Sequence, residues 1–380
     1  MSKPNFSILD ISLTSGGAEK VISLLLKELI KDYNVTLFLF YNEIHFEIPK
    51  EVNTVIFNKK GPNQRVYLKF FHAIGFLFKY NKLLKKRNIQ YAVSFLAFPN
   101  LINGISAIFN PSVKTFVSER GFPSDNTSSK LSFYISKVFY PMLYNRCYKL
   151  FSNSEYINQD LEKNFGIKIP MEVIYNPIEL PENTIDPKKY QKPGTPLKVI
   201  NVGSINTRKN QEMIIRSIAN LGGDFNLTIL GEGPLKIYLT ELSEKCNLED
   251  KVELKGKVKN VNEYLAKNDC FVLSSYTEGF PNALLEAIAV GLPSISTNCL
   301  SGPLELLNNN EDVEIEEGNF FKAKYGLLVN NNDVGGLAKA LSYLRENPSE
   351  LEKYSRLSLE RAKEYDLGSI YAKFNQFITN

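Results

Sequence analysis

Two glutamates in the last third of the chain, Glu278 and Glu286, are spaced so that they could bind different parts of one extended ligand. They follow the apolar residues 270–274, an expected strand, and open α/β sheets bind ligands at the carboxyl ends of their strands. Gly279 permits close approach of the backbone, and Pro281 suits the first position of a helix. The helix start would offer N–H groups and a positive dipole end to a diphosphate, and the carboxylates would pair with sugar or ribose hydroxyls.

Spacing alone leaves a second interpretation open, in which one glutamate favours the helix dipole and the other is simply solvated. The segment 276–293 resembles the E-x7-E signature of family 4 glycosyltransferases. The resemblance implies the GT-B architecture, an α/β fold of two doubly wound Rossmann-like domains that face each other across a central cleft. It also implies that Glu278 lies against the donor sugar and its leaving diphosphate, and that Glu286 binds the ribose hydroxyls. The implied donor-binding residues between them are Gly279, Phe280, Pro281, Asn282, Ala283 and Leu284.

The segment 202–210 resembles the stretch where the family places an arginine directly after a glycine and a lysine five residues later. Lys209 is present here, but Ser204 stands in place of the arginine. A cation beside a diphosphate stabilises the leaving group as negative charge develops on it, so Lys209 is a candidate catalytic residue. Arg208 is a candidate replacement for the missing arginine. An exposed lysine without a ligand is the alternative interpretation.

In the first half of the chain, Gly16 and Gly17 resemble the family's N-terminal glycine loop, which approaches the donor phosphate and the acceptor. Glycines before a helix make a pocket that tolerates anions, although a bare Gly-Gly turn would indicate little. Glu119 and Arg120 follow an expected strand and resemble the Ser-Glu-Arg stretch of relatives that build polysaccharides. They are candidates for contacts with the acceptor or with a diphosphate.

Further segments match the family in order, at residues 152–154, 173–178, 231–235 and 301–305. Those at 173–178 and 231–235 are interpreted as turns that support the fold, because their residues are ordinary turn formers. Small residues at 301–305 would leave room beside the diphosphate or the sugar, and a simple helix-starting turn is the alternative. The only histidines, His45 and His72, are expected at the surface or in packing.

Two series of alternating strands and helices must position these residues, which predicts two parallel sheets covered by helices on both faces. We expect an N-terminal Rossmann-like acceptor-binding domain over residues 1–182 and a C-terminal nucleotide-sugar-binding domain over 197–364. A proline-rich segment at 183–196 is the expected linker. A final helix at 365–380 is expected to pack back on the N-terminal domain.

Composition excludes several classes of protein. The chain has 380 residues, 43% of them hydrophobic, which suits two domains with separate cores. Its four cysteines have no metal-ligand spacing, and no Asp-x-Asp occurs, so we expect metal-free catalysis with no cofactor besides the nucleotide sugar. No signal peptide or apolar run of about 20 residues appears, which predicts a cytosolic protein.

Basic residues concentrate in the first half of the chain, which carries a formal charge of +7 up to Glu182 against −3 for the remainder. Two basic and aromatic segments, 64–87 and 130–149, could lie on the inner, anionic face of the cytoplasmic membrane. Core packing is the favoured interpretation for their phenylalanines, and the cluster from Lys82 to Arg87 is the better membrane candidate. No nucleic-acid motif appears.

These observations predict a retaining glycosyltransferase. It would move a hexose or N-acetylhexosamine from a nucleotide-diphosphate sugar, in particular a UDP-sugar, to a saccharide hydroxyl of a lipid-linked or surface glycan. Retention and front-face attack are implied by the resemblance. The alternatives are a GT-B epimerase or phosphorylase and a non-catalytic nucleotide- or glycan-binding protein, for which Ser204 is the only support. A dinucleotide-binding dehydrogenase is disfavoured, because residues 231–233 lack the third glycine in register.

Overall fold

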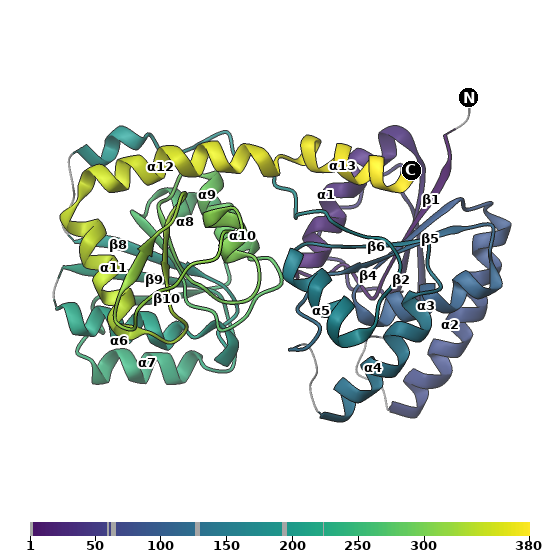
Figure 1. Ribbon diagram of the computed structural model, residues 1–380, viewed down its shortest axis with the longest axis horizontal. Coiled ribbons are helices and arrows are strands. Elements are labelled where there is room, and N and C mark those ends of the chain that lie inside the picture. Colours follow the sequence, from purple (N-terminus) through teal and green to yellow (C-terminus); the bar gives the residue numbers. More distant parts are fainter. Residues whose placement is uncertain (1–2, 59–60, 62–65, 126–129, 192–195, 223) are drawn as a thin grey trace. The chain divides into compact units, whose positions relative to one another are not determined.

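The chain folds into two compact units, seen in a computed structural model (Figure 1). The structure describes residues 3–58, 61, 66–125, 130–191, 196–222 and 224–380, with only the backbone described at 66–71 and 130–132. Unit 1 consists of Met1–Pro177 and Leu367–Asn380, and unit 2 of Ile178–Asp366. The chain therefore passes between the units at Pro177, where the sequence led us to expect residue 182, and returns at Leu367.

Unit 1 is built on a seven-stranded sheet with the order β3-β2-β1-β4-β5-β6-β7, in which all neighbouring strands are parallel. The strands are β1 (Asn5–Asp10), β2 (Asn34–Tyr41), β3 (Asn53–Asn58), β4 (Tyr91–Phe95), β5 (Lys114–Glu119), β6 (Lys149–Ser152) and β7 (Met171–Val173). The helices are α1 (Gly17–Asp32), α2 (Val66–Lys86), α3 (Ala97–Phe109), α4 (Lys130–Tyr144), α5 (Glu155–Phe165) and α13 (Leu367–Thr379). Strands of such sheets are apolar on both faces because helices cover both.

Helices α1 and α13 lie side by side on one face of this sheet, and α2, α3 and α4 lie across the other (Figure 1). The C-terminal helix belongs to unit 1 because its aromatic side chains complete that core. Phe374 packs against Phe6 and Phe151, and Phe377 packs against Phe116. The hydroxyl of Tyr371 donates to the Asp32 carboxylate of α1 at 2.6 Å.

Unit 2 repeats this plan with a seven-stranded sheet in the order β10-β9-β8-β11-β12-β14-β13, where only the β13–β14 pair is antiparallel. The strands are β8 (Leu197–Val202), β9 (Phe225–Leu230), β10 (Val252–Gly256), β11 (Cys270–Leu273), β12 (Ser294–Thr297), β13 (Phe320–Lys322) and β14 (Leu327–Val329). The α-helices are α6 (Gln211–Leu221), α7 (Lys236–Lys245), α8 (Val261–Ala266), α9 (Asn282–Ala289), α10 (Pro303–Asn308), α11 (Val334–Glu346) and α12 (Pro348–Ala362). Short 3-10 turns are η1 (Pro187–Gln191), η2 (Thr207–Lys209) and η3 (Lys363–Tyr365).

The proline-rich segment expected to link the domains does not stand apart from unit 2 over its described part. The Ile185 N–H donates to the Val290 carbonyl at 2.8 Å, and η1 packs against α12. Tyr190 is buried, with its hydroxyl donating to the carbonyl of Asp269 at 3.2 Å. The buried side chains of Ile185 and Tyr190 hold this otherwise polar stretch against unit 2. Among the described helices, none is both long and apolar enough to cross a membrane.

Candidate functional site

Glu278 lies in the loop after β11, at the carboxyl edge of the unit 2 sheet. Strand β8 is paired with β11, so the loop after β8, which carries Arg208 and Lys209, reaches the same edge beside it. Parallel strands place all their carboxyl ends at one edge. The strand order therefore brings together two segments that the sequence had singled out separately.

Both oxygens of the Glu278 carboxylate accept hydrogen bonds from these two cations. Lys209 Nζ donates to Oε1 at 2.5 Å, and Arg208 NH1 donates to Oε2 at 3.1 Å. The Ser275 hydroxyl also donates to Oε1 at 2.5 Å. The side chain of Glu278 is 6% exposed and that of Lys209 14%, whereas that of Arg208 is 47% exposed. The result is a cluster of one anion and two cations, with Arg208 on its solvent side.

Glu278 is ionised in this setting. Burial alone would raise the pKa of its carboxyl, but the charges of Lys209 and Arg208, together with hydrogen bonds from Lys209 and Ser275, outweigh burial and hold the pKa below its ordinary value. A carboxylate that is ionised and has both oxygens engaged is a poor general acid and a poor nucleophile. It is suited to holding two cations in place and accepting a hydrogen bond from a hydroxyl of a ligand.

The loop after β12 fixes the backbone around Glu278. The Ser301 N–H donates to the carbonyl of Glu278 at 3.0 Å, and the Ser301 hydroxyl donates to the carbonyl of Gly279 at 2.6 Å. Gly302 has a φ of 94°, and a Cβ atom there would lie 2.6 Å from Cδ of Pro281. Only glycine fits at that position. Ser301 and Gly302 were expected from the sequence to leave room for a ligand. In the structure they also hold in place the loop that carries Glu278.

The eight-residue helix α9 begins at Asn282. Pro281 is its N-cap residue, whereas the sequence suggested that Pro281 is the first residue of the helix. Glu286 lies in the second turn and is partly buried. Leu284 is fully buried, and its N–H donates to the carbonyl of Pro281 at 3.0 Å. Helical periodicity turns the side chain of Leu284 toward the core, and its expected contact with a ligand stays a prediction.

The remaining residues of this motif also comprise partly buried residues at the helix start and one side chain buried in the core. Gly279, Asn282 and Ala283 are partly buried and lie at the start of the helix. Phe280 is buried, with its ring centroid 5.8 Å from that of Tyr365. Phe280 therefore anchors the loop by packing, and it leaves only its backbone to face a ligand.

Ser204 is an exposed residue in the loop after β8, and its carbonyl accepts a hydrogen bond from Gln211 at 3.1 Å. Arg208, in the same loop, places its NH1 group between Glu278 and the Thr277 carbonyl, the latter at 2.9 Å. This contact between two loops could not be read from the sequence.

In unit 1, Glu119 and Arg120 lie together at the carboxyl end of β5, and both are buried. The Tyr144 hydroxyl donates to Glu119 at 3.1 Å, and Arg120 NH1 donates to the side chain of Asn176 at 3.0 Å. Burial raises the pKa of Glu119 to about 7, although hydrogen bonds and the nearby Arg120 charge oppose it. Burial likewise lowers the pKa of Arg120 to about 9.

The Arg120 guanidinium lies between two aromatic rings, 5.0 Å from the centroid of Phe95 and 4.9 Å from that of Phe151. Its Nε atom has no partner among the described residues. The two rings are perpendicular to each other, and aromatic rings at this distance favour the charged form of a guanidinium. Neither ring could be assigned to Arg120 from sequence spacing, because each comes from a different strand.

Glu119 gives a testable pH dependence. Because the fold prefers its protonated form, the ionised carboxylate destabilises the protein above about pH 7, and the cost is relieved as the pH falls from about 7 towards the ordinary value of 4.5. Glu119→Gln should therefore be more stable than the wild type at pH 8 and lose that advantage at pH 5, by on the order of 1 kcal/mol per pKa unit. Urea unfolding at both pH values measures this, and parallel curves would contradict it.

In the glycine turn of unit 1, the space beside Gly16 is occupied by the side chain of Glu19. Gly16 is the N-cap of α1, and a side chain there would overlap the carboxylate of Glu19. That carboxylate accepts a hydrogen bond from the Thr14 hydroxyl at 3.0 Å. Gly17 starts the helix. Gly16 therefore leaves room for the Glu19 carboxylate, a contact that the Gly-Gly pair alone did not indicate.

The structure thus assembles Glu278, Lys209 and Arg208 in unit 2, and separately Glu119 and Arg120 in unit 1. The sequence missed Ser275, because a hydroxyl is too common a feature to single out, and it named Ser301 and Asn176 only within longer segments that match the family. Over the described residues, no group of three or more His, Cys, Asp or Glu side chains is placed to hold a metal ion.

Solved structures resemble this one along nearly its whole length. The lipopolysaccharide outer core galactosyltransferase WaaB in its apo form has a TM-score of 0.75 at 18% identity, and each chain covers 99% of the other. The Anabaena protein HepE, solved with UDP and glucose, has a TM-score of 0.76 at 14% identity with the same coverage. These likenesses, together with the two parallel-sheet α/β units, show the GT-B fold.

Sequence matches place it more narrowly. Residues 15–181 match Glycosyltransferase Family 4, and residues 182–362 match Glycosyl transferases group 1. A Campylobacter jejuni N-acetylgalactosaminyltransferase, which acts on a saccharide on diphospho-undecaprenol, is 32% identical over 93% of this chain and 94% of its own. The chain belongs to glycosyltransferase family 4, and it is a glycosyltransferase of bacterial surface-glycan and lipid-linked saccharide biosynthesis.

Proposed function

We propose that this enzyme transfers a hexose or N-acetylhexosamine from a UDP-sugar to a saccharide hydroxyl on a lipid diphosphate, with retention of anomeric configuration. The cluster of Glu278, Lys209 and Arg208 before α9 carries the proposal, because it combines net positive charge with an acceptor for sugar hydroxyls. HepE, solved with UDP-glucose, supports uridine as the nucleoside of the donor. The Campylobacter jejuni relative supports the lipid-linked acceptor.

In the proposed reaction the bond between the anomeric carbon and the diphosphate oxygen breaks, and the acceptor oxygen bonds to that carbon on the same face. The acceptor proton passes to the departing diphosphate. Lys209 and Arg208 meet the negative charge that develops on the leaving group, and the N-terminus of α9 adds its dipole. Glu278 orients both cations and binds a donor hydroxyl, and Glu286 binds the ribose. No protein nucleophile is needed.

We propose that Arg120 and Glu119 of unit 1 serve the acceptor. A guanidinium held beside two aromatic rings can bind a phosphate or carboxylate group through its N–H groups. The nearby carboxyl, with its pKa raised to about 7 by burial, would be partly protonated near neutrality, so it could donate to an acceptor oxygen as well as accept from a hydroxyl. Acceptor and nucleotide sugar would meet at the inner face of the cytoplasmic membrane.

Nucleotide release tests the proposal. The enzyme would be incubated with UDP-, GDP- and ADP-sugars and a saccharide on undecaprenyl diphosphate, and the product examined by mass and by anomeric proton coupling. We expect UDP release coupled to sugar transfer with retained configuration, and undiminished release in EDTA, since we propose that no divalent cation is required. Release without transfer, or an inverted product, would refute the assignment.

Arg208 offers a rescue experiment at the same site. Arg208→Ala should lower kcat about tenfold, because one charge-assisted contact is lost while Lys209 remains. Adding Ser204→Arg to that variant should recover most of the loss by returning a guanidinium to the neighbouring position. Ser204→Arg alone serves as the control. If the double variant is no more active than Arg208→Ala, the cationic role of Arg208 is wrong.

A further inference from the structure

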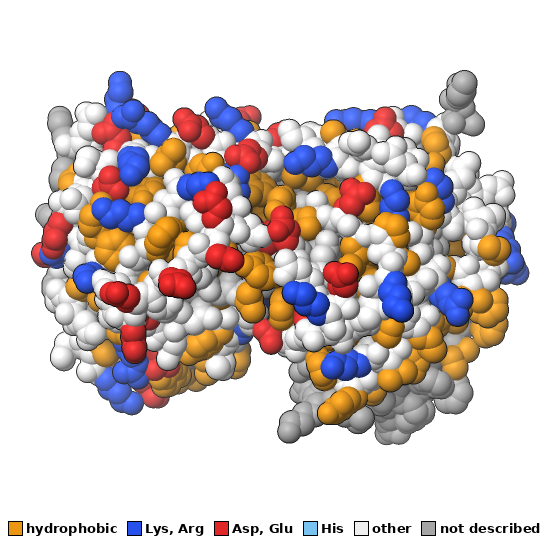
Figure 2. All heavy atoms as spheres, viewed as in Figure 1, with side chains coloured by type: hydrophobic (Ala, Val, Ile, Leu, Met, Phe, Trp, Pro, Cys, Tyr) orange, Lys and Arg blue, Asp and Glu red, His pale blue; other side chains and the backbone are white. Residues whose placement is uncertain are grey.

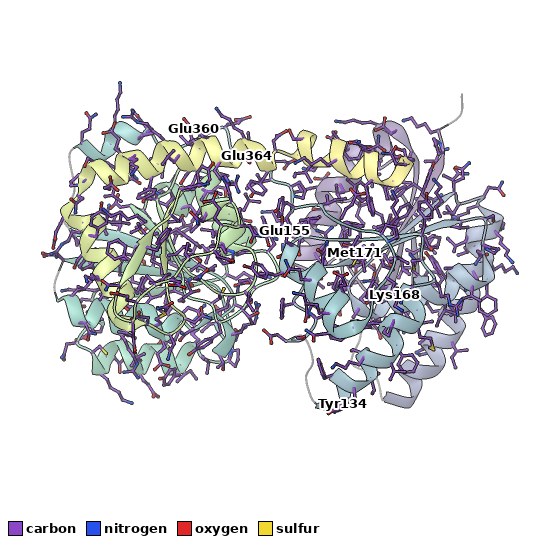
Figure 3. The ribbon with its side chains drawn as sticks, viewed as in Figure 1. Tyr134, Glu155, Lys168, Met171, Glu360 and Glu364 are labelled. Atoms are coloured by element: carbon purple, nitrogen blue, oxygen red, sulfur yellow. The ribbon has the colours of Figure 1, made fainter. Side chains whose placement is uncertain are left out.

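Helix α4 of unit 1 presents apolar side chains outward as well as inward. Its inner face, with Tyr140, Leu143 and Tyr144, is buried in the unit. Its outer face bears five exposed hydrophobic residues, each at least 40% exposed: Tyr134, Ile135, Val138, Phe139 and Met142. Figure 3 labels Tyr134 at one end of α4. A helix that is apolar on both sides at a protein surface marks a face that something else covers.

These five positions follow helical spacing and form one ridge, which we call the α4 ridge. The favoured expectation of core packing is thus wrong for Phe139 and for Phe78 of α2, which are 40% and 71% exposed. It is right for Phe76 of α2, which is buried. The side chains of Phe70 and Phe71 lie outside the described residues.

Charge on the α2 and α3 side of the α4 ridge is basic, whereas α5, which packs against α4, bears the exposed Glu155 and Glu162. Between Glu51 and Glu155 the sequence holds 15 lysines and arginines but only two acidic residues, Glu119 and Asp125. Glu119 is buried, so it adds nothing to the surface. Helices α2, α3 and α4 contain no acidic residue, and they are packed side by side in the order α2, α3, α4. Figure 2 shows apolar, basic and some acidic side chains on the visible face of this unit.

The lysines of α2 supply the exposed part of that charge. Lys79, Lys82, Lys85 and Lys86 are all exposed, and Lys137 lies on α4 itself, 4.8 Å from the ring centroid of Phe133. A second copy of the chain would bring two basic surfaces together, and like charges oppose that contact. Anionic lipids provide the complementary charge together with an apolar interior for the side chains of the ridge.

We propose that the α4 ridge inserts into the boundary between headgroups and acyl chains of an anionic lipid bilayer, with the lysines of α2 on the lipid phosphates. The inference deepens the proposed function, since it places unit 1 on the surface that holds a lipid-linked acceptor. It refines the sequence-based expectation, in which the cluster from Lys82 to Arg87 was the membrane candidate, by adding an apolar anchor on another helix.

Co-sedimentation with vesicles tests this surface without substrate. The full chain would be mixed with vesicles of phosphatidylglycerol and phosphatidylethanolamine, and in parallel with vesicles of phosphatidylcholine alone. We expect binding to the anionic vesicles, weakened by salt, and at least about tenfold weaker binding for Val138→Asp, the change expected when one apolar side chain is no longer buried. Tyr134→Glu should act in the same direction.

Ile237→Asp on α7 of unit 2 is the matched control, because Ile237 is 74% exposed but belongs neither to the α4 ridge nor to helices α2, α3 and α4. It should bind like the wild type, and thermal melting should show all three variants folded. Wild-type protein that stays in the supernatant would overturn the inference. So would a dimer in light scattering that Val138→Asp dissociates. Since the vesicles contain no saccharide and no nucleotide sugar, failure here is distinct from failure of the transfer reaction.

Discussion

Replacement of Glu278 by glutamine is expected to lower kcat about 100- to 1,000-fold while the donor still binds. Glutamine keeps the shape of the side chain, but it no longer holds the Lys209 ammonium and the Arg208 guanidinium by charge. Misplaced cations cannot meet the developing diphosphate charge, and losing one such preorganised electrostatic contact typically has an effect of about this size. The fall in kcat would be measured from steady-state rates, with the donor and acceptor that the nucleotide-release experiment identifies.

Stability should respond differently from activity. Glu278→Gln leaves Lys209, only 14% exposed, without its anionic partner, which should lower the free energy of unfolding by about 1–3 kcal/mol. Adding Lys209→Met removes the unpaired charge and should restore much of that stability, as replacement of a whole buried pair often does. Activity should stay low in the double variant. Recovery of both would show that the pair is structural and would refute its catalytic role.

Lys209→Met alone should lower kcat by a similar factor, about 100- to 1,000-fold, for a distinct reason. Here the leaving group loses the ammonium itself, while Arg208 remains on the other carboxylate oxygen. Methionine fills a similar volume, so packing changes little. Lys236→Met on α7 is the matched control, because Lys236 forms a solvent-exposed pair with Glu232. Its effect on rate and stability should be negligible.

The pH dependence of that variant tests the same contact. In the wild type the pKa of Glu278 lies below its ordinary 4.5, so its stabilising contribution is present above that value and is lost as the pH falls through the lower folded pKa. Without Lys209, burial remains and one opposing charge is gone, so the pKa rises. The residual rate of Lys209→Met should begin to fall at a higher pH than the wild-type rate. Coincident acid limbs would contradict this.

How far the sequence predicts the site is clearest for Lys209 and Glu278, which are 69 residues apart. The sequence marked both as donor-binding residues, because each follows an apolar strand and matches a family motif. Their contact at 2.5 Å depends on β8 and β11 being neighbours, although β9 and β10 come between them in the chain. Strand order is set by how whole βαβ units pack, which local patterns do not specify.

By itself the sequence determined the α/β class, the two-unit organisation and the identity of the charged residues, because periodicity and residue type are local properties. Only the tertiary structure decided that Arg208 reaches Glu278, that Glu19 fills the space at Gly16, and that residue 185 is folded onto unit 2. The outward face of α4 belongs with these. An apolar residue on a helix is buried or exposed according to what packs beside it, and that neighbour is supplied by distant parts of the chain.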